Sequence, residues 1–394
     1  MAKLIEITGK AISGEWGIED ADGSGIPVLR TTNFTNEGIV NYENIVTRKI
    51  SKKNIDKKYL IQGDIIIEKS GGSDKQPVGR VVFFEGLERK YLFNNFTGLL
   101  RIKDRDKWEP KYVFYSLYSN YRKGGTKAFE NKTTGLHNLK TDDYISKFNI
   151  KDTAIEEQRS ICRKLDAICE IIKLKQEQFS KLDELIKSQF VEMFGDPVQN
   201  PKGWRTKSFL DMGNCKNGMN FHYAETGIAI NCLGVGDFKD LDIIGDVEKL
   251  SRVTLNEMPS EEYLLKDGDI VFVRSNGNRA LVGRSLVVYP KDVSTTFSGF
   301  CIRYRKTDDT VTIPYLLRVL KTNSMRQKMV GRGANIQNLN QQILGTLEIP
   351  IPPIELQNQF AVFVRHVDKQ KSTTQKSINN LQTLFDSLMQ KYFG

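Results

Sequence analysis

Two long stretches of the chain place apolar residues at alternating three- and four-residue steps. In residues 151–195 the series is Leu165, Ile168, Ile172, Phe179, Leu182, Ile186 and Met193. In residues 354–394 it is Val364, Val367, Ile378, Leu381, Phe385, Leu388 and Tyr392. Heptad spacing of this kind predicts two helices that pair as a coiled coil. Both stretches lack Gly and Pro for about 40 residues, so each helix is predicted to be about 60 Å long.

The remaining residues, 1–150 and 196–353, mix short apolar runs with turn signals. Runs at 64–67, 81–84 and 270–273 predict strands, and Gly- or Asn-containing turns separate them. Residues 110–121 and 314–330 each open with proline, which suits the first turn of a helix. The pattern therefore predicts an α+β fold for both segments.

The chain contains two copies of one plan, because short matching strings recur in the same order about 200 residues apart. The matched strings are Gly63-Asp64-Ile65 with Gly268-Asp269-Ile270, Val78-Gly79-Arg80 with Val282-Gly283-Arg284, Phe96-Thr97-Gly98 with Phe297-Ser298-Gly299, and Asn138-Leu139 with Asn338-Leu339. The repeat predicts globular domains at 1–150 and 196–353 and long helices at 151–195 and 354–394. Two equivalent helices can pair antiparallel about a pseudo-two-fold axis, with one globular domain at each end.

Composition limits the class of protein. With 39% hydrophobic and 27% charged residues, the chain can bury cores of ordinary size. It has no apolar run long enough to span a membrane, and its first residues do not resemble a signal peptide. Five cysteines without a C-x-x-C pair argue against a disulfide framework or a zinc site, and indicate a cytoplasmic protein.

A net charge of +10 suggests a polyanionic partner, with nucleic acid first among the candidates. The equally weighted alternative is a lysine-rich protein whose charge has no binding role. Two basic domains at a fixed separation would suit double-stranded DNA with two half-sites. A separation of about 60 Å corresponds to at most roughly 17 base pairs.

The candidate DNA contacts lie where predicted strands end in polar turns. Lys69 and Arg274 end equivalent strands, and the residues that follow combine hydroxyl and amide groups suited to phosphates or base edges. These candidates are Lys69, Ser70, Arg274, Ser275, Asn276, Asn278 and Arg279. A solvated hairpin turn is the alternative interpretation.

Two further regions supply candidates. A polar run contributes Arg30, Thr31 and Asn33, and loops after the short helices contribute Lys127, Lys132, Arg332 and Gln337. The run aligned with residues 30–33 is Gly234-Val235-Gly236-Asp237, which differs chemically and leaves the first-copy run without a counterpart. The Asn-Leu pair that occurs after both short helices is interpreted as a local structural cap and not as a contact to DNA bases.

No catalytic motif is found. The sequence has no P-loop and no N-P-P-[FY] loop, and its three histidines lie far apart. A nuclease-like string, Asp64 and Glu68 followed by Lys69, becomes Asp269, Val273 and Arg274 in the second copy. Because the second copy loses a carboxylate and keeps the cation, a metal site is disfavoured. No catalytic, cofactor-binding or metal-binding residue is assigned.

The ordered set of these features resembles the specificity subunit of type I restriction-modification systems. The resemblance covers the whole chain and includes the strings at residues 26–34, 156–161, 194–197, 200–204 and 349–357. It implies two target-recognition domains, each reading one half of a split, asymmetric DNA site, joined by helices that set the gap. It also implies that the chain has no catalytic activity and no cofactor of its own.

The same resemblance implies partners for the chain. Two modification subunits would bring S-adenosylmethionine and methylate adenine, and restriction subunits would use ATP and Mg²⁺ to translocate and cut DNA. Three alternatives remain open: a methylation-only complex, a non-catalytic coiled-coil interaction protein, and a nuclease that uses Asp64 and Glu68. The last predicts Mg²⁺-dependent cleavage by the chain alone.

Overall fold

The computed structural model describes residues 1–51, 55–133, 136–220, 227–238, 242–330 and 338–394. The chain forms two compact units, which are described one at a time. Unit 1 consists of Met1–Gln176 and Lys376–Gly394, and unit 2 consists of Glu177–Gln375. Each long helix therefore contributes one half to each unit.

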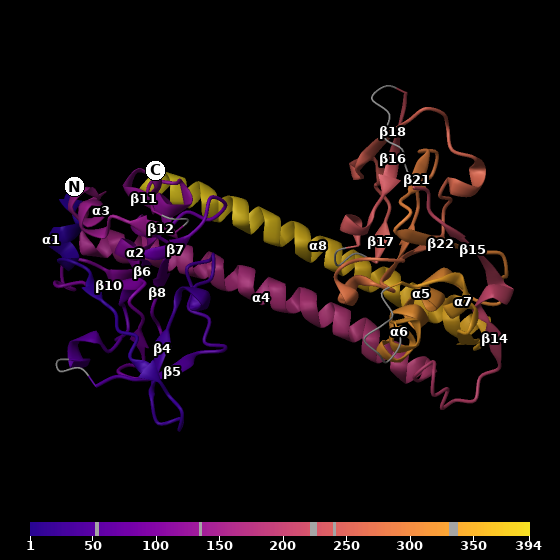
Figure 1. The fold of residues 1–394 in the computed structure, drawn as a ribbon, viewed down its shortest axis with the longest axis horizontal. Helices are drawn as coiled ribbons and strands as arrows, with labels where there is room; N and C mark the ends of the chain where they lie inside the picture. Colours follow the sequence, from indigo (N-terminus) through magenta and orange to yellow (C-terminus); the bar gives the residue numbers. More distant parts are fainter. Residues whose placement is uncertain (52–54, 134–135, 221–226, 239–241, 331–337) are drawn as a thin grey trace. The chain divides into compact units, whose positions relative to one another are not determined.

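Unit 1 combines small sheets with short helices (Figure 1). Its central sheet has the order β2 (Ile12–Ser13), β10 (Thr97–Leu100), β6 (Ile65–Glu68) and β8 (Val81–Phe83). A second sheet has the order β3 (Ile18–Glu19), β5 (Val46–Lys49), β4 (Ile26–Leu29) and β9 (Leu92–Phe93). The third has β11 (Glu130–Thr133), β12 (Leu136–Leu139) and β7 (Ser70–Gly72), and β1 (Ala2–Lys3) pairs with β13 (Asn149–Ile150). The helices are α1 (Leu4–Thr8), α2 (Pro110–Arg122) and α3 (Thr141–Lys147).

Unit 2 repeats this scheme with longer strands. Its central sheet has the order β15 (Gly213–Asn217), β22 (Cys301–Lys306), β19 (Asp269–Val273), β20 (Ser285–Val288) and β17 (Ile243–Ile244). A second sheet has the order β18 (Arg252–Leu255), β16 (Ile228–Leu233) and β21 (Thr295–Phe297), and β14 (Thr206–Ser208) pairs with β23 (Glu348–Pro350). The helices are α5 (Ile313–Lys321), α6 (Asn323–Val330) and α7 (Gln341–Gly345).

Strand pairing confirms that the chain contains two copies of one plan. β6 lies between β10 and β8 with antiparallel pairing, and β19 lies in the same way between β22 and β20. The second sheets also agree, because β4 pairs in parallel with β9 and β16 pairs in parallel with β21. The predicted α+β class is likewise confirmed.

One predicted match between the copies is wrong. Leu29 is paired with Phe93 and Leu233 with Phe297, so Phe93, not Phe96, corresponds to Phe297. The short strings F-T-G and F-S-G look alike, but they occupy different places in the sheets. Hydrogen-bond register, which depends on residues far apart in the chain, decides the correspondence.

The predicted helix at 314–330 is interrupted. Helix α5 ends at Lys321 because Thr322 has an extended backbone, with φ −64° and ψ 148°. The Thr322 hydroxyl donates to the carbonyl oxygen of Val319 at 2.8 Å, and α6 then begins at Asn323. Side-chain bonds of this kind to a local carbonyl compete with helix continuation. The helix predicted at 110–121 is confirmed as α2.

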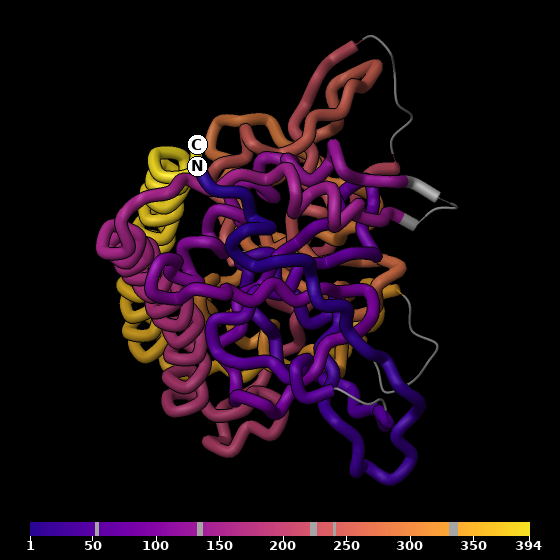
Figure 2. The backbone as a smooth tube through the Cα atoms, turned by 90° about the vertical axis from the view of Figure 1, so that its left-hand side faces the viewer, coloured from indigo at the N-terminus to yellow at the C-terminus, as the bar shows by residue number. Residues whose placement is uncertain are grey.

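The two long helices, α4 (Ile155–Phe194) and α8 (Ile354–Phe393), lie side by side (Figures 1 and 2). In unit 1, Leu165 and Ile168 from the first half of α4 share a core with Phe385 from the last half of α8. In unit 2 the halves are reversed: Asp183 of α4 accepts a hydrogen bond from the Lys371 ammonium of α8 at 2.6 Å. The predicted antiparallel coiled coil is confirmed.

The buried face of α4 shifts near its end. The heptad pattern placed Met193 in the seam, but Phe190 and Phe194 are the buried residues there, while Met193 is half-buried. The ring of Phe194 packs against Tyr315 of α5 at 4.8 Å between centroids and against Phe360 of α8 at 5.5 Å. At this end of α4, which packs against other elements of unit 2, the buried apolar residues follow the four-residue step of an ordinary amphipathic helix.

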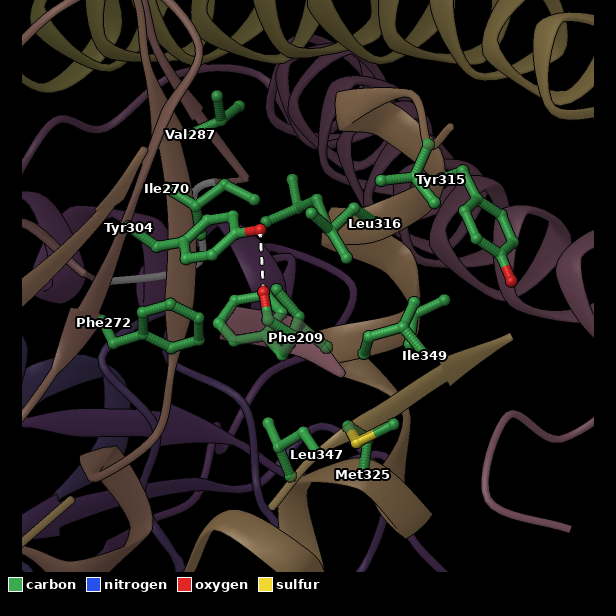
Figure 3. Packing of buried hydrophobic residues seen from close by; sticks show 14 of the residues in the cluster. Phe209, Ile270, Phe272, Val287, Tyr304, Tyr315, Leu316, Met325, Leu347 and Ile349 are labelled. Atoms are coloured by element: carbon green, nitrogen blue, oxygen red, sulfur yellow. Dashed lines mark hydrogen bonds between the residues drawn. The ribbon is translucent and has the colours of Figure 1, made fainter. Parts of the chain in front are cut away.

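The core of unit 2 fills the space between the central sheet and α5 (Figure 3). Phe209 stacks on Tyr304 with ring centroids 3.9 Å apart, and the Tyr304 hydroxyl donates to the Phe209 carbonyl oxygen at 3.1 Å. All five residues of β19 are buried. A strand buried on both faces in this way holds its end, and the residues that follow it, in a fixed position.

Candidate nucleic-acid interface

The strongest candidates, Lys69 and Arg274, lie at equivalent positions at the ends of β6 and β19. The Lys69 amide donates to the Phe96 carbonyl oxygen at 2.8 Å, and the Lys69 carbonyl oxygen accepts from Leu139 at 2.8 Å. Arg274 makes the same two bonds, with Phe300 at 2.8 Å and with Leu339 at 2.8 Å. The structure thus places one cation in each unit on the same backbone frame.

The two cationic side chains have different surroundings. The Lys69 ammonium donates to the Ser13 hydroxyl at 3.2 Å, and partial burial lowers the pKa of this lysine although Asp142 opposes the shift. The Arg274 guanidinium donates to the Gly299 carbonyl oxygen at 3.3 Å. The acceptors of these two bonds are a hydroxyl and a carbonyl oxygen, and an ammonium or a guanidinium carries more than one N–H donor, so both side chains have further donor capacity.

The serines and the shared Asn-Leu pair belong to the same frame. Ser70 is paired with Asn138 across β7 and β12, and Ser275 forms an isolated bridge with Asn338. Leu139 and Leu339 are buried. These observations support the interpretation of the Asn-Leu pair as a structural element.

The turn after Arg274 is organised by its own side chains. The Asn276 amide oxygen accepts from the Asn278 backbone at 2.7 Å, and the Asn278 amide oxygen accepts from Ala280 at 3.0 Å. Arg279 follows in an exposed 3-10 turn, η8 (Arg279–Leu281). Each asparagine therefore stabilises the turn through its side-chain oxygen. Among the described residues, neither side-chain amide nitrogen takes part in these two turn bonds.

The polar run at residues 30–33 has a structural counterpart, contrary to the sequence-based expectation. It forms the 3-10 turn η1 (Thr31–Asn33), and the second copy forms η5 (Val235–Asp237). Asn33 accepts from the Arg30 amide at 3.0 Å, and Asp237 accepts from the Gly234 amide at 2.8 Å. The two runs share a conformation and differ in the side chains that they present.

Within the polar run at residues 30–33, the three candidates differ in how far they are exposed. Asn33 is buried, and its amide nitrogen donates to the carbonyl oxygens of Asn41 at 3.1 Å and Glu43 at 3.2 Å. Its side chain stabilises the loop, so Asn33 is no longer a candidate for contact with DNA. Arg30 and Thr31 are half-buried, and the Arg30 guanidinium donates to the Asn44 carbonyl oxygen at 3.4 Å.

The two carboxylates of the nuclease-like string are each bound by an arginine. Asp64 accepts two hydrogen bonds from Arg101, at 2.8 and 2.7 Å, and Glu68 accepts two from Arg80, both at 3.1 Å. The bond to Asp64 raises the pKa of Arg101. Asp269 is bound in the same way by Arg305, at 2.9 and 2.7 Å. These are bidentate ion pairs inside the units, so the geometry favours a structural role.

Sequence reasoning missed the role of Arg80 and Arg284. Arg80 donates to the Thr31 carbonyl oxygen at 3.2 Å and to that of Phe34 at 3.3 Å, and it thereby holds the η1 loop against β6. Arg284 donates to the carbonyl oxygen of Phe238, after η5, at 3.3 Å. The repeated Val-Gly-Arg string was the signal that could have indicated this role.

Lys127 lines an open cleft of about 610 Å³ in unit 1. Three more cationic residues line the same cleft, Lys75, Arg122 and Lys123. Arg122 pairs with Asp386 at 2.6 Å, and the Lys123 ammonium donates to the Phe393 carbonyl oxygen at 3.1 Å. Sequence reasoning named only Lys127; the basic pair Arg122-Lys123 at the end of α2 could have indicated two of the others, and no signal in the sequence pointed to Lys75.

The remaining candidates are described in part or not at all. Lys132 lies in β11, in a stretch whose side chains are not described, and Arg332 and Gln337 lie outside the described residues. Throughout the part of the chain that the structure describes, no group of three His, Cys, Asp or Glu side chains is placed to hold a metal ion. In that same part, every helix is too short or too polar to cross a bilayer.

Comparison with known families identifies the chain. The model of the type I restriction modification DNA specificity domain matches twice, at residues 1–184 and 201–383. The chain belongs to this family. With two such domains in tandem, it is a specificity subunit of a type I restriction-modification system.

Two relatives that are named specificity subunits are similar to the chain along most of their length. The chain is 24% identical to the StySPI specificity subunit of Salmonella potsdam, over 93% of this chain and 80% of the relative. It is 21% identical to the EcoKI specificity subunit of Escherichia coli K12, over 98% of this chain and 84% of the relative.

Solved structures share the fold. The S subunit from M. genitalium has a TM-score of 0.55 and 14% identity, covering 100% of this chain and 95% of the other. A chain from a study of complex assembly and conformational transition in the type I system has a TM-score of 0.59 and 16% identity, covering 100% of this chain and 96% of the other.

Proposed function

We propose that each unit of this specificity subunit reads one half of a two-part, asymmetric DNA sequence. The observation that supports this proposal is that the two units share backbone hydrogen bonds and turns at the candidate site but differ in the side chains there. The ends of β6 and β19 have the same hydrogen bonds but present Lys69 and Arg274, and η1 and η5 have the same turn but present different residues. Equivalent frames would place two readers alike, while different side chains would select different bases.

We propose further that the chain performs no catalysis and acts through partners. Two modification subunits would dock on it and supply S-adenosylmethionine for adenine methylation, and restriction subunits would supply ATP- and Mg²⁺-dependent cleavage. The helices α4 and α8 would set the gap between half-sites, because each runs without interruption from one unit into the other. In support, the carboxylates that could have served a nuclease are held by Arg80 and Arg101.

The decisive experiment is single-molecule sequencing of adenine methylation in cells with and without this gene. Loss of one split, asymmetric motif on deletion, with its return on complementation, is the expected result. It would give the recognised bases and the gap together. A silent locus is excluded beforehand by expressing the gene with its modification subunit from a plasmid.

An unchanged methylation pattern from that expressed pair would contradict the proposal. The coiled-coil interaction alternative predicts that outcome, together with the absence of salt-dependent, sequence-specific DNA binding. A methylation-only complex would pass this test, and it is separated from full restriction-modification by assaying ATP-dependent cleavage of unmethylated DNA in the presence of the restriction subunit.

A further inference from the structure

Among the described residues, each unit exposes one phenylalanine close in the backbone to its candidate cation. Phe96 is 50% exposed and Phe300 is 61% exposed, and no other phenylalanine of the described residues is among the exposed large apolar side chains. An exposed phenyl ring forgoes the stabilisation of burial, which is about 1.5–3 kcal/mol for a large apolar side chain. Single exposed apolar residues are common and need no explanation, so position has to decide whether these two have a role.

The two rings occupy the same place in the two copies. Phe96 accepts hydrogen bonds at its carbonyl oxygen from Lys69 at 2.8 Å and Ser70 at 3.2 Å. Phe300 accepts from Arg274 at 2.8 Å and Ser275 at 3.3 Å. The residues before them differ, Asn94-Asn95 in one copy and Ser298-Gly299 in the other. An exposed aromatic ring therefore recurs at an equivalent position although its neighbours in sequence have diverged.

The backbone under each ring is held in place on both sides. A tight turn is closed by the bond from Thr97 to the Asn94 carbonyl oxygen at 3.1 Å, and in unit 2 by the bond from Cys301 to that of Ser298 at 2.8 Å. The residues just before these turns, Phe93 and Phe297, are fully buried. A ring presented from such a backbone loses little conformational freedom on binding.

The rings lie next to the cations that the proposed function assigns to DNA. The Arg274 guanidinium donates to Gly299, one residue before Phe300, at 3.3 Å. Lys69 and Phe96 share a backbone hydrogen bond. An apolar ring beside a cation is a combination that proteins use on nucleic acid, because the ring contacts base faces or methyl groups while the cation contacts phosphate or a base edge.

We propose that Phe96 and Phe300 are apolar base contacts, one for each half-site of the recognised duplex. The proposal rests on the proposed function and adds to it the residues through which each unit contacts bases. The contact is apolar, so it adds sequence-dependent affinity and leaves the phosphate-dependent part of binding unchanged.

The test uses the complex of this chain with its modification subunits and a duplex carrying the methylated motif found by sequencing. Two further duplexes have one half-site or the other scrambled. We expect Phe96→Ala to weaken binding to the intact duplex by roughly 10- to 100-fold, the range of one lost aromatic–base contact. Scrambling the half-site read by unit 1 should then cost less than it does in the wild type, whereas scrambling the other half-site should cost as much as it does in the wild type.

Phe300→Ala should give the mirror-image result, and Phe96→Leu should recover part of the loss. The slope of affinity against salt should be unchanged in all variants. Leu87→Ala in unit 1 and Met258→Ala in unit 2 are matched controls, because both side chains are exposed and apolar but lie in other loops. These controls should bind as the wild type does.

Three results would overturn the inference. Alanine variants that bind all duplexes like the wild type would show that the rings do not contact DNA. Variants that no longer co-purify with the modification subunit would place the rings at a protein interface instead. A wild-type complex that fails to distinguish the intact from the scrambled duplexes would refute the proposed function itself, and the inference with it.

Discussion

At the scale of single residues, the two copies keep the side chains that stabilise the strand ends and loops and differ in some of the side chains proposed to contact DNA. Asp64 and Asp269 are both bound by an arginine, and Arg80 and Arg284 each hold the loop at η1 or η5. Lys69 of the first copy is replaced by Arg274 in the second, and both are half-buried. An arginine offers a planar fork of donors and a lysine a single charge, so the two would not contact DNA in the same way.

We expect Lys69→Ala to weaken binding to one half-site and Arg274→Ala to weaken binding to the other. A lost base contact should cost about 1–3 kcal/mol at its own half-site. The measurement is fluorescence anisotropy with intact and half-scrambled duplexes, and Lys173→Ala on an exposed position of α4 is the control. An equal loss on every duplex would instead make both residues phosphate contacts.

The buried Glu68–Arg80 pair leads to a prediction about stability. Glu68 is 1% exposed, so Glu68→Ala leaves the Arg80 guanidinium without its partner in a largely buried position. We expect the free energy of unfolding to fall by about 3–5 kcal/mol, measured by urea denaturation. The double variant Glu68→Leu with Arg80→Met should recover only the part of the loss that comes from the unpaired charge, because Arg80 also binds the carbonyl oxygens of Thr31 and Phe34. A fully stable Glu68→Ala protein that has lost Mg²⁺-dependent cleavage would support the nuclease alternative.

At the scale of elements, the long helices combine two kinds of packing. In unit 2, Leu182 and Ile186 follow the predicted heptad steps, but the last turns of α4 bury Phe190 and Phe194 against α5 and α8. Heptad spacing predicts the pairing of two helices because it is a local pattern. Contacts with a third helix depend on the fold of the whole unit.

We expect Phe360→Ala in α8 to destabilise unit 2 more than the loss of any exposed residue of the same helix. Its ring is fully buried and packs against Phe190 at 5.6 Å and Phe194 at 5.5 Å. The expected loss is about 3–5 kcal/mol in the free energy of unfolding, because the substitution leaves a cavity. Val362→Ala, at an exposed position of α8, is the control and should change little.

At the scale of the whole molecule, the proposed function makes the length of the helices a functional quantity. Each helix has 40 residues and contributes to both units, so its length connects the two proposed readers. Removing seven residues shortens a helix by about 10 Å and changes the direction of its faces by only about 20°. A heptad deletion therefore preserves the seam.

We expect deletion of one heptad from both helices to shorten the gap between the half-sites by at most about three base pairs. Residues 171–177 of α4 and 377–383 of α8 are the segments to remove, since the contact between Asp183 and Lys371 sets the register of the pair. Sequencing of methylated adenine in cells gives the new gap directly. Unchanged spacing with both half-sites intact would show that the helices do not determine the gap.

A deletion in one helix only serves as the control. It shifts one helix along the other, so buried residues such as Phe385 and Phe360 lose their packing partners on α4. We expect this variant to assemble poorly and to methylate little. Equal activity of the single and double deletions would mean that the pairing of α4 and α8 is not required.

The sequence by itself determined the repeat, the α+β class and the two long helices. These features depend on local patterns: matching strings in order, and apolar residues at three- and four-residue steps. Lys69 and Arg274 could also be paired from sequence, because each ends a clearly apolar strand.

Only the tertiary structure decided which residues of the two copies correspond in the loops and which polar groups are available. Three findings depend on bonds between segments that are not adjacent in the chain. They are the match of Phe96 with Phe300, the burial of Asn33 and the ion pair of Glu68 with Arg80. Hydrogen-bond register and burial are set by the packed fold, and a single sequence shows neither.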